Sequence, residues 1–174
     1  MGVGAEGVPK TSYYDAKFGP GRWQGFMPRL RAAFESAGIE LTMEGRTGPT
    51  SEAHRVLCHA YDSLGAEAQD ALQESLMRAY FAEGRPPCDP GVIRECVREA
   101  KLGEPFEADA LAPGSDSGRE SLAEELGLAR ARGVRGVPHF IITEESSGRE
   151  LELSGAQPPE AFLEAFEELG LDVE

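Results

Sequence analysis

The chain has 174 residues and a formal net charge of −14, with 31 acidic against 17 basic side chains. This length predicts one domain, or one domain with an insertion, that buries enough surface to fold without a disulfide or a metal. The acidity argues against non-specific nucleic-acid binding. Because no long apolar run occurs, we expect neither a membrane span nor a secretory leader.

The chain has three cysteines, Cys58, Cys88 and Cys96, and they are widely spaced. They form no Cys-x-x-Cys or Cys-x-Cys pair, so the sequence predicts neither a zinc knuckle nor a redox dithiol, and no metal site. Without an export signal we expect a cytoplasmic location, in which all three remain thiols.

The sequence changes character along the chain and predicts three parts. Residues 1–21 contain glycine and proline without periodicity, which predicts an irregular N-terminal tail. Residues 22–118 predict a helical subdomain, interrupted by a short half-buried strand at residues 39–43, where apolar and polar side chains alternate. Residues 119–174 predict a helix, two strands and a final helix opened by Pro158-Pro159.

Apolar side chains at helical spacing locate the helices within these parts. The pattern predicts helices over residues 23–37, 51–64, 66–84, 90–102, 105–111 and 121–132. Thr50 or Ser51 is the expected N-cap of the second helix, and Asp89 followed by Pro90 is a favoured helix start. The strands are expected near residues 140–142 and 151–153.

A proline at the entrance of the first of these strands is the most informative local feature. The segment is GVRGVPHFII, residues 133–142. A tight turn followed by β-branched residues is compatible with a cis peptide bond before Pro138, because proline reduces the trans preference to about 0.5–1 kcal/mol. The alternative is an ordinary trans proline at the start of a strand.

This segment resembles the cis-proline loop of DsbA-like thioredoxin-fold proteins, and in particular the FrnE-type oxidoreductases associated with polyketide biosynthesis. Three further segments resemble that branch in the same order. The helix start Asn-Thr/Ser-x-x-Ala-His-Arg is matched by TSEAHR, residues 50–55. The Tyr-Phe-x-Glu-Gly…Asp-Pro signature is matched by YFAEG and the following Asp-Pro, residues 80–90. The entry to the last helix is matched by SGAQP, residues 154–158.

The resemblance implies an α+β fold, in which a large helical insertion accompanies an incomplete thioredoxin-like core. Residues 119–174 would be its C-terminal strand–strand–helix half. In the family, the other half carries a Cys-Pro-Trp-Cys-type motif, which has no match in this chain. The implied substrate-binding residues are Val137, Pro138 and His139, with the Val137 backbone pairing with a substrate strand. The implied function is disulfide oxidoreduction of proteins or small thiols, with weak or no activity because the catalytic cysteines are absent.

The catalytic residue is therefore unknown, and each cysteine has a competing structural interpretation. Cys88 is the best candidate, because it precedes a helix N-terminus, although the charge of Asp89 raises the pKa of a neighbouring thiol. Cys96 is expected to fill the core. Cys58 lies on the same side of its helix as His54. The two could form a thiolate–imidazolium couple or half of a metal site, but we favour the interpretation that both only pack. His139 either assists proton transfer or, as we favour, is a strand residue with its tip at the surface.

Two other functions remain open: a glutathione-dependent isomerase or transferase of the 2-hydroxychromene-2-carboxylate isomerase and kappa-class group, and a non-catalytic binding module or fragment of a longer protein. The expected partners are a thiol or disulfide peptide or glutathione, without nucleic acid or membrane, and no cofactor other than glutathione is implied. An exposed edge of the strand at residues 140–142 predicts a homodimer, aggregation, or pairing of this edge with residues 39–43 or the N-terminal tail.

Overall fold

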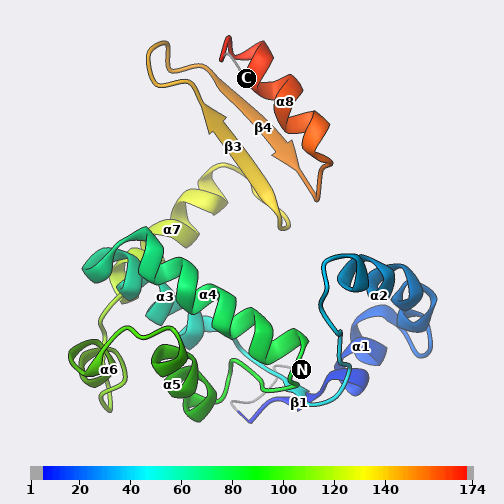
Figure 1. Ribbon diagram of the computed structural model, residues 1–174, viewed down its shortest axis with the longest axis vertical. Helices are drawn as coiled ribbons and strands as arrows, with labels where there is room; N and C mark the ends of the chain where they lie inside the picture. The colour runs from blue at the N-terminus through cyan, green and yellow to red at the C-terminus, as the bar shows by residue number, and fades with distance from the viewer. Residues whose placement is uncertain (1–5, 172–174) are drawn as a thin grey trace. The chain divides into compact units, whose positions relative to one another are not determined.

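The computed structural model describes residues 6–171, in which helices predominate and two separate sheets have two strands each (Figure 1). The chain forms two compact units, unit 1 over Met1–Ala123 and unit 2 over Glu124–Glu174. Helix α7 (Arg119–Ala131) contains the boundary between them. The sequence analysis placed its division at the start of this helix.

Unit 1 is built around four helices, α3 (Ser51–Leu64), α4 (Ala66–Phe81), α5 (Pro90–Glu99) and α6 (Glu104–Ala110). Gly65 adopts φ +89° and turns the chain from α3 into α4, a conformation that glycine adopts without steric cost. The Asp89 carboxylate caps α5 by accepting a hydrogen bond from the Gly91 N–H at 2.7 Å. These helices confirm the predicted ones, with small differences at their ends.

The four helices enclose one hydrophobic core. Val56, Leu72 and Cys96 are fully enclosed in it. Cys96 therefore fills the core as a small apolar side chain, as the sequence predicted. The other core residues are Ala53, Leu57, Ala60, Leu76, Ala79, Val92, Ile93, Val97, Phe106 and Ala110.

The N-terminal part of unit 1 contains β1 (Val8–Pro9), α1 (Lys10–Phe18), the 3-10 turn η1 (Trp23–Gly25), α2 (Met27–Ser36) and β2 (Arg46–Thr47), with β1 and β2 antiparallel. The prediction of an irregular tail over residues 1–21 is wrong where α1 lies, and residues 1–5 fall outside the described residues. Contacts from outside the helix hold α1. The Trp23 ring lies 6.0 Å from that of Tyr14, and Trp23 Nε1 donates to Asp15 at 2.8 Å.

The predicted strand at residues 39–43 is not formed. Its alternating pattern does not correspond to one buried face either: Leu41 is 6% exposed, whereas Ile39, two residues earlier on the same face of the predicted strand, is 42% exposed. The backbone bonds to the end of a helix instead: the Thr42 N–H donates to the Phe81 carbonyl at 2.8 Å. The alternation therefore predicted neither the exposure of Ile39 nor the hydrogen-bonding partner of Thr42.

Lys10 is buried at the start of α1 and fixes this helix to the end of α4. Its ammonium group donates to the Tyr80 carbonyl and lies 4.2 Å from the centre of the Tyr80 ring. A cation at the C-terminal end of a helix is favourable because the last carbonyls carry partial negative charge. Burial nevertheless lowers the pKa of Lys10 from its ordinary value near 10.5.

We expect Lys10→Met to lower the free energy of unfolding by about 1–2 kcal/mol, because the Tyr80 carbonyl loses its charged donor. In the wild type the unfolded chain binds this proton more tightly than the folded chain. Stability therefore rises with pH between the lowered pKa and 10.5, and the variant should lose this rise. Denaturant unfolding between pH 8 and 10.5 measures both effects. Lys17→Met, on the exposed side of α1, is the control, and identical pH profiles for all three proteins would contradict the prediction.

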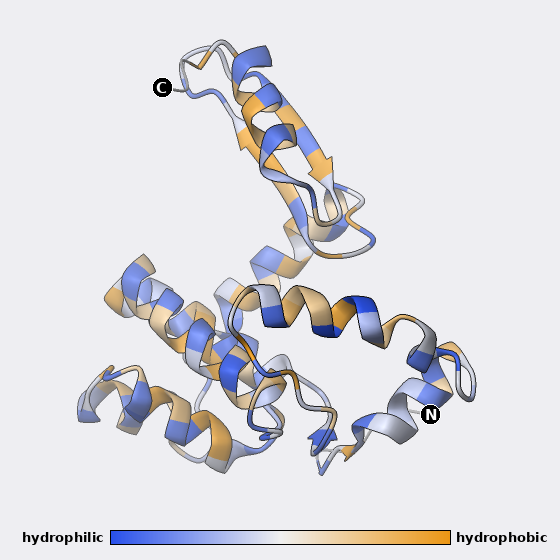
Figure 2. Cartoon of the chain, turned by 45° about the vertical axis from the view of Figure 1, so that its right-hand side comes forward, coloured by the Kyte–Doolittle hydropathy of each residue, from blue (hydrophilic) through white to orange (hydrophobic). Residues whose placement is uncertain are grey.

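Unit 2 contains β3 (His139–Thr143), β4 (Glu150–Ser154) and α8 (Pro159–Glu168) after the end of α7. The strands are antiparallel; in Figure 2, hydrophobic and hydrophilic residues alternate along β4, whereas β3 carries a continuous hydrophobic run. On one face, the ring of Phe162 in α8 packs edge-on against that of Phe140 at 4.8 Å. Arg132 forms two hydrogen bonds with Glu150, at 2.9 and 3.1 Å. The predicted order of helix, strand, strand and helix is confirmed.

Candidate functional site

The predicted substrate-binding segment lies where the chain enters β3. The Val137–Pro138 peptide bond is cis, the isomer that the turn and the family resemblance predicted. Val137 is 90% exposed. The hairpin begins immediately after it, because the Pro138 carbonyl accepts a hydrogen bond from the Gly155 N–H at 2.8 Å. Within residues 6–171 no hydrogen bond engages the Val137 backbone. The loop is therefore anchored to β4 at Pro138 and leaves the polar groups of Val137 available.

His139 follows the proline and is less exposed than the sequence suggested. Its side chain is 13% exposed, and its Nε2 lies 3.5 Å from a carboxylate oxygen of Glu152 on β4. That buried nitrogen has no hydrogen-bond partner among the described residues. The interpretation with the tip at the surface is therefore wrong. The imidazole therefore packs against β4, next to the loop.

Cys88, the candidate nucleophile, lies in unit 1 between Pro87 and the Asp89 cap of α5. Two glycines pack closely against its thiol: a side-chain carbon on Gly48 would lie 2.5 Å from Sγ, and one on Gly7 3.2 Å away. Burial raises the pKa of the Cys88 thiol, and the charge of Asp89 raises it further. The loop therefore holds a protonated thiol, which is a poor nucleophile.

The other two cysteines do not improve the prospects for exchange. Burial raises the pKa of Cys96 to about 11, with a contribution from the charge of Glu99. Cys58 is partly buried on α3, one turn after His54. No disulfide joins any of the three, and no group of three or more potential metal ligands occurs among the described residues.

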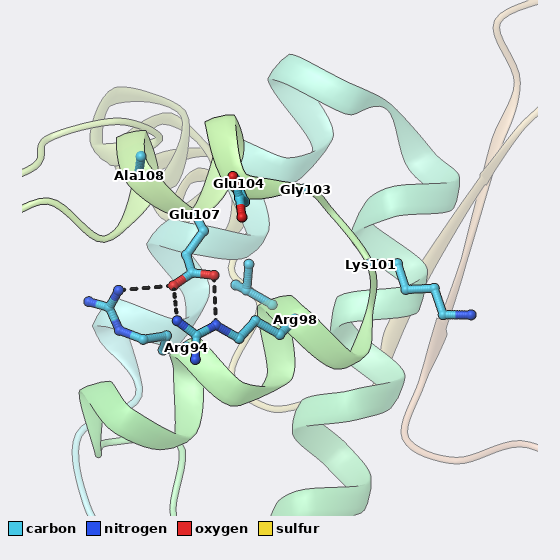
Figure 3. A pocket seen from close by; sticks show the side chains of 8 residues that line it. Arg94, Arg98, Lys101, Gly103, Glu104, Glu107 and Ala108 are labelled. Atoms are coloured by element: carbon cyan, nitrogen blue, oxygen red, sulfur yellow. Dashed lines mark hydrogen bonds and ion pairs between the residues drawn. The ribbon is translucent and has the colours of Figure 1, made fainter.

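Sequence reasoning missed a charged pocket of about 710 Å³ between α5 and α6. Arg94 and Arg98 converge there on one carboxylate, that of Glu107, at distances of 2.7 to 3.0 Å (Figure 3). These donors lower the pKa of Glu107. Figure 3 also shows that Lys101 points away from this group. The helical spacing of the two arginines was visible in the sequence, but their shared acceptor was not.

A second, apolar pocket of about 250 Å³ was also missed. Its walls come from α3, α4 and the segments that precede α3 and α5. The residues that line it are Thr47, Thr50, Ala53, His54, Leu57, Gln73, Leu76, Met77, Tyr80, Phe81 and Pro87. His54 therefore borders a cavity, to which Met77 and Tyr80 supply apolar surface.

Arg55, which belongs to the TSEAHR segment, has a structural position. Its buried guanidinium donates to the Ala110 carbonyl at 2.8 Å, to the Ser117 carbonyl at 2.6 Å and to the Glu52 carboxylate at 2.9 Å. It thereby holds the end of α6 and the following loop on α3. The motif that carried the family resemblance is therefore, at this position, a packing feature.

The structure thus brings Val137, Pro138 and His139 together in unit 2, whereas the three cysteines belong to unit 1. A model of the DSBA-like thioredoxin domain matches residues 3–167. No curated protein matches the sequence. Within residues 6–171, no helix has both the length and the apolar composition that crossing a membrane requires.

Proposed function

Because the chain belongs to the family of DSBA-like thioredoxin domains, whose members resemble thiol–disulfide oxidoreductases, we propose that it docks a thiol- or disulfide-containing peptide without completing the exchange reaction. The docking residues are Val137, Pro138 and His139. The exposure of Val137, together with its unengaged backbone N–H and C=O, carries the proposal. An extended peptide can pair with these groups as a short added strand.

The absence of exchange follows from the thiols. The reaction needs a thiolate that attacks a disulfide and a second thiol that resolves the mixed disulfide. Unit 2 has no cysteine, and the raised pKa values of Cys88 and Cys96 keep these thiols protonated at neutral pH. Cys88 and Cys96 are therefore inefficient nucleophiles at neutral pH, and the chain has no Cys-x-x-Cys pair.

We also propose that the chain belongs to the FrnE-type branch and represents an incomplete thioredoxin core with a helical insertion. The strand–strand–helix order of unit 2 supports the second half of such a core. Two of the segments that resemble this branch have structural roles: Asp89 caps α5, and Arg55 binds the carbonyl at the end of α6. The division between the helical insertion, residues 22–118, and the C-terminal half of the core, residues 119–174, is part of this proposal, whereas the irregular tail over residues 1–21 is not, because α1 lies in it.

Peptide binding tests the docking proposal. A fluorescent extended peptide with a central cysteine should bind the wild type, and Val137→Glu should weaken it about tenfold, the loss expected when burial of one valine is prevented. Leu128→Glu adds the same charge at another exposed apolar position of unit 2 and should bind like the wild type. A serine-containing peptide and reduced glutathione, added as competitors, show whether the thiol or the glutathione skeleton is recognised.

Two results would contradict the proposal. One is the absence of binding to the wild type at millimolar peptide concentrations. The other is unchanged affinity of Val137→Glu, which would place the peptide elsewhere. If glutathione competes at lower concentration than the peptide, the glutathione-dependent isomerase or transferase becomes the better interpretation.

A further inference from the structure

The backbone of β3 has one edge that no described strand pairs with. In an antiparallel pair, the residues that bond to the neighbouring strand alternate with residues whose N–H and C=O point away from it. The hairpin bonds Gly155 N–H to Pro138 O at 2.8 Å and Glu144 N–H to Arg149 O at 2.9 Å fix the even-numbered residues as the ones that face β4. The residues that direct their backbone groups to the open edge are therefore His139, Ile141 and Thr143.

The two outer edges of this hairpin differ in charge. On β4 the residues of the outer edge include Glu150 and Glu152, and charged side chains at an edge discourage pairing with another strand. The β3 strand, HFIIT, has no acidic residue and no lysine or arginine. Phe140 and Ile141 each remain 36% exposed. An uncharged, partly apolar strand with an open edge is a surface suited to strand addition.

We propose that β3 pairs with β3 of a second copy of this chain, antiparallel and related by a two-fold axis that passes through Ile141. Only odd-numbered residues direct backbone groups outward, so they must face one another. The register that uses all of them places Ile141 opposite Ile141 of the partner subunit, and His139 opposite Thr143 of the partner subunit. Each opposed pair can exchange two backbone hydrogen bonds. The contact is isologous and therefore closes as a dimer.

The side chains fit this register. The even-numbered residues lie on the face that Phe162 covers, so Phe140 would adjoin Ile142 of the partner subunit and continue that apolar face across the junction. A second copy is favoured over an unrelated strand because the pairs are self-complementary and bring no like charges together. Because the net charge is −14, other surfaces of two copies repel each other, and the uncharged edge of β3 is the more favourable place for them to meet. His139 takes part in both the dimer and the docking proposal, whereas Val137 and Ile141 each belong to only one of them. Val137→Glu therefore tests the docking proposal and Ile141→Lys tests the dimer, so the two can fail separately.

Cysteine cross-linking tests both the dimer and its register. Residues opposed in a hydrogen-bonded pair have Cα atoms about 5.5 Å apart, within the range of about 4.4–6.8 Å that a disulfide spans. Ile141→Cys, oxidised with copper phenanthroline, should therefore give a covalent dimer, with the introduced thiols identified in the linked peptide by mass spectrometry. In Thr143→Cys the introduced thiols would lie four residues apart along the strands, about 13 Å, and should not link. Wild type gives the background from the native cysteines.

The oligomeric state provides the second measurement. Sedimentation of the wild type should show a concentration-dependent dimer. Ile141→Lys should be monomeric, because two ammonium groups would face each other across the axis. Leu163→Lys, which adds the same charge on exposed α8 surface, should still dimerise. A monomeric wild type, a dimer unaffected by Ile141→Lys, or equal cross-linking of the two cysteine variants would overturn the proposal.

Discussion

Replacing Gly118 by alanine is expected to lower the free energy of unfolding by about 3 kcal/mol or more, through backbone strain and overpacking together. The added carbon would lie 2.3 Å from the Arg55 carbonyl oxygen and 2.6 Å from the His59 nitrogen. Both atoms belong to the backbone of α3, which carries the core. The helix cannot withdraw without disturbing that core, and Gly118 also has φ +77°.

Gly114→Ala is a matched control for this change. Gly114 has the same φ of +77°, and no atom lies within 4 Å of the position that a side-chain carbon would occupy. In this variant the free energy of unfolding should fall only by the cost of an alanine at positive φ, about 1–2 kcal/mol. Equilibrium denaturation of the two variants isolates the contact with α3. Equal losses would contradict the close approach of the loop to this helix.

Arg55→Met is expected to destabilise the protein by about 3–5 kcal/mol, the range observed when one partner of a buried charged interaction is removed. The buried Ala110 carbonyl and the half-buried Ser117 carbonyl would remain without their donor. Arg55→Lys should be intermediate, because a single ammonium group cannot reproduce the fork of the guanidinium. Denaturant unfolding measures the series.

Arg94→Met provides the comparison on an exposed surface. Arg94 forms an ion pair with Glu107 at 3.0 Å, and its own side chain is partly solvated, so its loss should cost less than about 1 kcal/mol. Comparable losses at Arg55 and Arg94 would show that burial does not distinguish the two. Arg55 and Gly118 are in contact through α3, so we do not expect their effects to add.

The helices of unit 1 could be predicted because each shows its own signals. In α3 the apolar side chains recur at helical spacing, and in α5 the Asp89-Pro90 pair marks the start. The hairpin and the last helix of unit 2 had comparable local signals in their β-branched residues and in Pro158-Pro159. Local sequence patterns are sufficient to predict a helix or strand whose own residues determine which side is buried.

Elements that depend on distant partners could not be predicted. Helix α1 is held by Lys10 beneath the end of α4 and by the contact of Tyr14 with Trp23, and neither produces a periodic pattern. The segment that precedes β2 alternates like a strand, yet Thr42 bonds to the end of a helix far away in the sequence. The alternating pattern of this segment therefore determined neither the burial of Ile39 nor the partner of the Thr42 N–H.

The candidate site divides in the same way. Val137 and Pro138 were predicted as docking residues because the local turn resembles the cis-proline loop of the family, and this role stays a prediction. The approach of His139 to Glu152 depends on the hairpin register, and the packing of Cys88 against Gly48 depends on a contact between residues forty positions apart. Both contacts belong to tertiary structure, and each determines the burial of a residue that the sequence had singled out.

Turnover of glutathione disulfide or insulin by the purified chain tests most directly the claim that it docks thiol substrates without exchanging them. We expect wild type and Cys88→Ser both to show the rate of a protein-free control, because the Cys88 pKa is raised and unit 2 supplies no thiol. The assay should be run from pH 7 to 9, over which any thiolate fraction increases. Wild-type turnover well above the control, abolished in Cys88→Ser, would contradict the account and identify Cys88 as the nucleophile.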